Sequence, residues 1–105
     1  MHNQLNLFNI VNTLRHMRLT HDPKKLAANV AKHGVWFDLA KDFEWETALI
    51  VVDDRLRYGE TRFSAMGLID GRLYVLIFTL RETSVRIISL RKANIKEVKR
   101  YANTN

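Results

Sequence analysis

Residues 72–91 read RLYVLIFTLRETSVRIISLR. The first part of this stretch alternates between two sets of apolar side chains, which are Tyr74, Leu76 and Phe78, and Leu73, Val75 and Ile77. Successive side chains of a strand point to opposite faces, so a strand over 72–79 needs cover on both faces. Helices can cover one of these faces and a partner protein the other.

Turn signals on either side extend this strand into an antiparallel meander. Asp70-Gly71 is typical of a tight hairpin turn, and Arg81-Glu82-Thr83 of a polar one. Short connections of this kind join antiparallel neighbours. The remaining apolar or β-branched runs complete a predicted four-stranded antiparallel sheet, with strands over 47–52, 61–67, 72–79 and 84–91. The polar residues 53–60 form a loop between the first two.

Capping residues mark helices before and after the sheet. Asp22 is a good N-cap, Pro23 suits the first helical position and Gly34 offers a left-handed stop, which predicts a helix over 23–33. Residues 36–46 favour a short second helix or turn. A last helix over 94–101 opens with Asn94 and has Glu97 three residues on, the spacing of a capping box. The predicted class is α+β, with N-terminal and C-terminal helices flanking the sheet.

Length and composition indicate one packed domain. The chain has 105 residues, 47% of them hydrophobic and 27% charged, with only four Gly and one Pro. A chain of this size buries a single modest core. Residues 1–16 carry a roughly helical spacing and form an N-terminal extension, and residues 17–105 form the domain. There is no signal-peptide or membrane-spanning run, so we expect a cytoplasmic protein.

The charge of the chain points to a polyanionic partner. Lys and Arg total 17 against 11 Asp and Glu, a formal charge of +6. Residues 81–100 hold seven cations and two acids, so most of the excess lies in the last quarter. Such a surplus suits nucleic acid or an acidic protein equally well.

Most familiar catalytic motifs are missing. The sequence has no phosphate-binding glycine loop, no HExxH and no nucleophile elbow. It has no cysteine, and its four histidines lack the spacing of metal ligands. We therefore expect neither a metal site nor a cofactor.

The charged residues that remain suit metal-independent cleavage of RNA. In that reaction the ribose 2′-OH attacks the adjacent phosphate, a base takes its proton, an acid supplies another, and fixed cations stabilise the phosphorane. Arginine suits the last role because its planar fork grips phosphate oxygens in pairs. The candidates are Arg62, Arg81, Arg86, Arg91 and Lys92, together with His33 and Glu60.

Each candidate also has a structural interpretation. His33 is either the acid or base, or a cap whose imidazolium meets the helix dipole. Glu60 is either the base or the ion-pair partner of Arg62, two positions on. Arg86 and Arg91 are an odd number of positions apart, so an unbroken strand turns them to opposite faces and only a bulge or an early strand end brings them together. The basic residues of 81–100 also suit a plain solvated surface.

From about Leu19 to Tyr101 the order of segments resembles the BrnT toxin family. The matching elements are Asp-Pro-Lys (22–24), Asn29, Lys-His-Gly-Val (32–35), Phe37, Ala40, Tyr-Gly-Glu-Thr-Arg-Phe (58–63), Gly67, Val-Leu-Ile-Phe-Thr (75–79), Arg81, Arg-Ile-Ile-Ser-Leu-Arg-Lys-Ala (86–93), Glu97 and Tyr101. No element is specific alone, but the ordered set is.

The resemblance implies a RelE-like fold and a function. Members are endoribonuclease toxins of type II toxin–antitoxin systems that inhibit translation and growth, and the implied partner is a BrnA-like, DNA-binding antitoxin. The implied catalytic residues are Glu60, Arg62, Arg81, Arg86 and His33, and the implied RNA-binding residues are Lys24, Lys32, Arg91 and Lys92. The competing hypothesis is a non-catalytic module that binds RNA or only the antitoxin.

Overall fold

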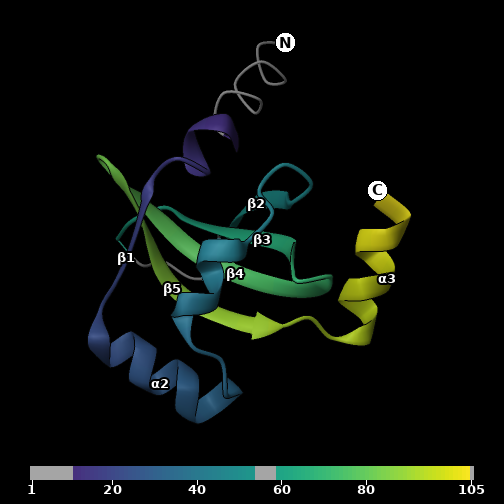
Figure 1. Cartoon of the computed structure of the whole chain (residues 1–105), viewed down its shortest axis with the longest axis horizontal. Helices are drawn as coiled ribbons and strands as arrows, with labels where there is room; N and C mark the ends of the chain where they lie inside the picture. The colour runs from purple at the N-terminus through teal and green to yellow at the C-terminus, as the bar shows by residue number, and fades with distance from the viewer. Residues whose placement is uncertain (1–10, 54–58, 105) are drawn as a thin grey trace.

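The computed structural model describes residues 11–53 and 59–104 of the chain (Figure 1). Its elements in order are β1 (Arg18–His21), α2 (Pro23–His33), the 3₁₀ helix η1 (Phe37–Asp42), β2 (Leu49–Asp53), β3 (Arg62–Ile69), β4 (Arg72–Arg81), β5 (Ser84–Lys92) and α3 (Ile95–Thr104). The five strands form one sheet in the order β1-β5-β4-β3-β2.

The predicted four-stranded antiparallel sheet is wrong in strand number and in one pairing. Strands β2 to β5 form the expected meander, but β1 adds a fifth strand, parallel to β5, with Arg18 opposite Ser84 and His21 opposite Ile87. Residues 18–21 are too few to show a period of their own. Their strand geometry comes from hydrogen bonds to β5, and the sheet is therefore mixed.

The predicted ends of the helix over 23–33 and the Asp70-Gly71 turn are confirmed, whereas the last helix continues to Thr104 instead of ending at 101 and η1 is shorter than the predicted 36–46. The Asp22 side chain accepts a hydrogen bond from the Lys24 amide at 2.9 Å, and Gly34 ends α2 with a φ of 68°. Asp70 and Gly71, with φ of 50° and 77°, make the two-residue turn between β3 and β4. Both have the positive φ that a type I′ hairpin turn requires.

Two predicted segments fall partly outside the described residues. Residues 1–10 of the N-terminal extension and residues 54–58 of the loop are not described. Residues 11–14 are helical, and Leu14 is buried in the main core with only 2% of its surface exposed. Arg15 forms an ion pair with Glu46. The domain boundary at residue 17 stays a prediction.

One face of the sheet carries the main core. Both η1 and α2 pack on this core face, and η1 crosses it in Figure 1. Leu76, Phe78, Ile87 and Leu90 are at most 1% exposed. The Phe43 ring lies so close to Gly67 that a Cβ there would overlap it. The core face is closed by the chain's own side chains.

The opposite face is covered only in part. A smaller apolar cluster of Met66, Leu73 and Val75 lies there, with Tyr101 of α3 against it. None of the α3 residues is buried, and Ile95 and Val98 stay exposed. Figure 1 shows α3 at one end of the sheet, so the rest of this face lacks a helical cover within the described residues.

The Asn29 side chain links α2 to the part of β5 that β1 does not pair with. Strand β1 pairs with β5 only as far as Ile87. Beyond that point the Asn29 carboxamide donates to Leu90 O at 2.7 Å and accepts from Leu90 N at 3.1 Å, and it also donates to Val35 O at 2.9 Å. The side chain therefore takes the place of a strand neighbour.

Replacing Asn29 with Ala should lower the free energy of unfolding by about 2–4 kcal/mol, because each buried polar group left without a partner costs about 1–3 kcal/mol. Denaturant unfolding of the purified chain measures the change. The control is Asn103→Ala, which removes an exposed carboxamide from α3 and should shift the free energy by less than about 0.5 kcal/mol. Equal effects of the two substitutions would contradict this role for Asn29.

Candidate functional site

Four of the predicted site arginines lie on the sheet face opposite the core, which we call the arginine face. Their positions follow from the strand register: Arg81 is opposite Ser84, Arg86 opposite Thr79 and Arg91 opposite Val75. Leu76 and Phe78 point into the main core, so the odd-numbered residues of β4 and their β5 partners point the other way. By the same alternation, Arg62 of β3 lies on the face opposite Phe63. The set is Arg62, Arg81, Arg86 and Arg91.

A bulge in β5 brings Arg86 and Arg91 to the same face. Phe78 pairs with Ile87, but the next residue of β4, Ile77, pairs with Ser89. Ile88 is therefore an extra residue, which restores the inside position of Leu90 and turns Arg91 outward. The sequence allows Arg86 and Arg91 to share a face only if the strand is bulged or ends early, and the bulge at Ile88 meets this condition.

A row of polar side chains crosses the sheet near the β4–β5 turn. Asp53 of β2 is opposite Arg62 of β3, Thr79 of β4 is opposite Arg86 of β5, and Arg86 is opposite Thr20 of β1. The Thr79 hydroxyl donates to Thr61 O at 2.7 Å and so ties β4 to the start of β3. Arg62 and Arg86 lie two strands apart, about 10 Å, which long side chains span.

Glu60 lies between two of these arginines. Its Oε2 is 3.6 Å from Nε of Arg62, and its Oε1 accepts a hydrogen bond from Nη2 of Arg81 at 3.3 Å. The Glu60 side chain is 30% exposed, Arg62 15% and Arg81 53%. The carboxylate therefore holds the two guanidinium groups together while remaining open to solvent.

Arg91 belongs to a separate interaction. Its Nη1 and Nη2 donate to both oxygens of Glu97 at 2.9 and 2.8 Å. Glu97 also accepts from the Asn94 amide, and Asn94 Oδ1 accepts from the Glu97 amide, so the predicted capping box is confirmed. The hydrogen bonds from Arg91, opposed by partial burial, lower the pKa of Glu97 to about 2. Arg91 thus anchors the start of α3 to the sheet.

Arg91 is separated along the sheet from the other three arginines. It is opposite Val75, which is four residues before Thr79, the partner of Arg86, and six residues before Arg81 on β4. At about 3.3 Å per residue, these separations are about 13 and 20 Å. Arg62, Arg81 and Arg86 with Glu60 therefore form one cluster, the Glu60 cluster, and Arg91 lies outside it.

His33 lies nearer to Arg91 than to the β4–β5 turn. It ends α2, which packs beside β5 through Asn29 and Leu90. Burial, then the charges of Lys32 and Arg91, lower the pKa of His33. A lowered pKa favours the neutral imidazole, whereas capping of the helix dipole requires the charged one. His33 can accept a proton at neutral pH, but the fold does not bring it into the Glu60 cluster.

The other predicted RNA-binding residues lie away from the Glu60 cluster. Lys24 and Lys32 are exposed on α2, which packs against the core face. Lys92 follows Arg91 on β5 and is opposite Tyr74, a residue of the main core cluster, so it belongs to the other face. Any contact from these lysines to RNA therefore lies outside the arginine face.

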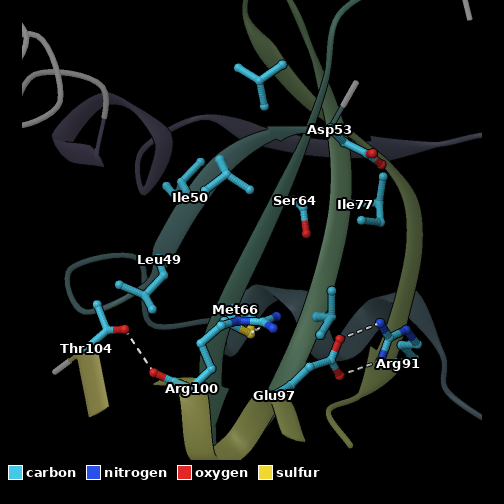
Figure 2. Close-up of a pocket in the computed structure, with 13 residues that line it drawn as sticks. Leu49, Ile50, Asp53, Ser64, Met66, Ile77, Arg91, Glu97, Arg100 and Thr104 are labelled. Atoms are coloured by element: carbon cyan, nitrogen blue, oxygen red, sulfur yellow. Dashed lines mark hydrogen bonds and ion pairs between the residues drawn. The ribbon is translucent and has the colours of Figure 1, made fainter. Parts of the chain in front are cut away.

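A groove runs along the arginine face from Asp53 toward α3 (Figure 2). Figure 2 shows Ser64, Met66 and Ile77 on its floor and the Arg91–Glu97 pair at one end. Asp53 is only 7% exposed. Sequence reasoning missed Asp53 and Thr79, because strand register alone places them beside the arginines. The signal available was only that a β-branched run ends in a carboxylate at Asp53.

Neither a metal cluster nor a membrane span occurs in the described part of the chain. Over residues 11–53 and 59–104, no group of three or more His, Asp or Glu residues could hold a metal ion. Of the helices within those ranges, none is both long and apolar enough to cross a membrane.

Comparison with known proteins identifies the family. Residues 21–97 match the family model of the ribonuclease toxin BrnT of type II toxin–antitoxin systems. The chain belongs to the BrnT family. It is similar to the 1.1 Å crystal structure of the Brucella abortus ribonuclease toxin BrnT, with 26% identity and a TM-score of 0.57 over 74% of this chain and 97% of that one. No curated protein matches the chain.

Membership in the BrnT family confirms the resemblance read from the sequence. The match covers the segments from the last residue of β1 to the start of α3, including all four residues of the Glu60 cluster. A ribonuclease toxin of a type II system acts on RNA and has an antitoxin partner. Membership in the family therefore implies an RNA substrate and an antitoxin partner for this chain.

Replacing Glu97 with Gln should loosen α3 and lower the free energy of unfolding at pH 7 by about 1.5–3 kcal/mol, the usual contribution of hydrogen bonds to a charged group. The pKa of Glu97 is lowered in the folded chain, so its stabilisation is present above the ordinary value of 4.5 and is lost as the pH falls toward about 2. Urea unfolding across this range should show the two proteins converging. The control is Glu82→Gln, in the exposed turn after β4. If the difference in unfolding free energy between wild type and Glu97→Gln stays constant over this pH range, the Arg91–Glu97 pair is not its cause.

Proposed function

We propose that the Glu60 cluster is the RNA-cleaving site of this toxin and that it works with side chains alone. The observation that carries this proposal is the placement of Arg62 and Arg81 on the two oxygens of Glu60, with Arg86 on the same face. A carboxylate among guanidinium groups supplies a proton acceptor and phosphate-binding cations in one place.

The proposed reaction assigns a step to each side chain. The Glu60 carboxylate takes the proton of the 2′-OH, and the 2′ oxygen forms a bond to the adjacent phosphorus. Arg62, Arg81 and Arg86 bind the phosphate oxygens and stabilise the negative charge of the phosphorane. The bond from phosphorus to the 5′ oxygen then breaks, that oxygen takes a proton from water, and the hydroxide left behind takes the proton held by Glu60. The products are a 2′,3′-cyclic phosphate and a free 5′ hydroxyl.

The geometry favours Glu60 over His33 as the base. Glu60 contacts two of the cluster's arginines, whereas His33 ends α2 beside the Arg91 end of β5. A general base must lie within hydrogen-bond reach of the proton that it removes. A phosphate held by Arg62 and Arg86 is therefore served by Glu60.

Cleavage of cellular RNA by this cluster would stop translation and growth, and a BrnA-like, DNA-binding antitoxin would neutralise it. The charge of +6 supports both partners, because RNA and an acidic antitoxin segment are each attracted to the same basic face. The competing function is a module that binds RNA without cutting it.

Replacing Arg86 with Gln should lower the rate of RNA cleavage by about 10²–10³-fold, the usual loss when one group that stabilises a transition-state charge is removed. Retention of RNA on a filter should change little, and growth arrest on expression should disappear. The matched control is Arg72→Gln, an exposed arginine at the start of the neighbouring strand β4. If wild-type protein binds RNA but leaves it intact, with and without chelator, the binding module is the correct function.

The Glu60→Gln and His33→Gln variants should separate the two candidate bases. The loss of a general base costs about 10²–10⁴-fold in rate. We expect this loss for Glu60→Gln and nearly full activity for His33→Gln, measured as the single-turnover rate on a labelled RNA. The reverse order of the two rates would assign the base to His33.

A further inference from the structure

The groove on the arginine face has room for protein side chains. Its volume is about 580 Å³, and it lies between α3 and strands β2 to β4. The floor is mostly aliphatic and is formed by Leu49, Val51, Met66, Val75 and Ile77. Burial of aliphatic side chains in such a site is favourable in proportion to the apolar area removed from water.

The groove itself is a poor site for RNA. Two carboxylates, Asp53 and Glu97, are among the residues that line it, and one of its cations, Arg91, is engaged by Glu97 through two hydrogen bonds. Among the described residues that line it there is no aromatic ring, so those residues offer splayed bases no stacking surface. Its apolar floor and its carboxylates favour a peptide over a polyanion.

One wall of the groove is an open sheet edge. Among the described strands β2 is at the end of the order, with a neighbour on one side only. Val51 of β2 is 61% exposed, and its side chain points to the same face of the sheet as that of Ser64. An edge strand presents free amides and carbonyls that a second extended chain can pair with.

The surroundings of the groove are basic. Arg100, exposed on α3, lies along one side, and its Nη2 is 4.0 Å from Sδ of Met66. At the other end Asp53 pairs in register with Arg62, so the Glu60 cluster begins where the groove ends. An occupant with acidic residues beside its apolar ones is favoured by this charge, whereas a second copy of the chain carries +6 and is repelled.

We propose that the groove is the docking site of the antitoxin, which adds an extended acidic segment to the edge of β2. Alternate aliphatic side chains of that segment lie on Val51 and Ile77, and its acids pair with Arg100 and with the Glu60 cluster. The same segment then excludes RNA from the cluster. In this inference the location of the RNA site rests on the proposed function, whereas the location of the docking site does not.

The test uses a matched pair of substitutions on β2 and, as the probe, the purified protein encoded by the reading frame next to the gene of this chain. Val51→Glu places a carboxylate on the groove side of the strand. Val52→Glu makes the same change at a residue of nearly equal exposure, 57% against 61%. Val52 also borders the groove, but its partner Phe63 packs with the main core, so the Val52 side chain is on the other face of the sheet. The titrations should show about tenfold weaker binding for Val51→Glu and almost none of this loss for Val52→Glu.

Hydrogen exchange provides the second measurement. The amides of Leu49–Asp53 should exchange more slowly in the complex than in the free chain, because an added strand pairs with the open edge. Unchanged exchange there overturns strand addition. A probe that does not bind the wild-type chain, or that binds both variants equally, overturns the docking site.

The remaining outcomes identify another occupant or separate the two proposals. If Val51→Glu retains less RNA but binds the probe with unchanged affinity, the groove is an RNA surface. If the wild-type chain forms a dimer that Val51→Glu breaks, the groove is a self-association surface. Either outcome overturns the proposal. If Val51→Glu weakens the probe while wild-type protein cuts no RNA, the docking site stands and the proposed function fails. If wild-type protein cuts RNA and the probe binds Val51→Glu as tightly as wild type, the proposed function stands and the docking site fails.

Discussion

The extra residue in β5, Ile88, controls which side chains of the chain's last strand share a face. Before it, Val85 and Ile87 point into the core; after it, Leu90 points inward again, and all three are at most 1% exposed. An unbroken strand would shift the later residues by one position, which moves Leu90 to the outside and Arg91 into the core. The bulge therefore allows a continuous core and, on the opposite face, two arginines five residues apart.

The arginine face is organised by carboxylates as much as by arginines. Like charges on neighbouring strands repel, so guanidinium groups gathered on one face need anions between them. Glu60 provides this between Arg62 and Arg81, and Glu97 provides it for Arg91. The two carboxylates therefore have different surroundings: Glu60 is open to solvent in the cluster that we propose as the RNA-cleaving site, whereas the Arg91–Glu97 pair holds α3 in place and borders the groove.

The unequal cover of the two sheet faces explains how one small toxin can serve two partners. The chain closes its core face with η1 and α2, but α3 covers only one end of the arginine face. The uncovered part carries both the basic cluster that suits RNA and the aliphatic groove that suits a peptide. Because the groove and the cluster meet at Asp53 and Arg62, an antitoxin docked in the proposed site would lie next to the proposed RNA-cleaving cluster.

Local signals in the sequence were sufficient for much of the fold. The Asp22 and Gly34 caps, the Asp70-Gly71 turn, the Asn94–Glu97 capping box and the alternating strand over 72–79 depend on residues close together in the chain. The charge and the family also follow from the sequence alone. Strand β1, the bulge at Ile88, the neighbours Asp53 and Thr79, and the separation of Arg91 and His33 from Glu60 do not, because each depends on which strand lies beside which and in what register. Such pairings are decided by contacts between distant segments when the core closes, and only the tertiary structure contains them.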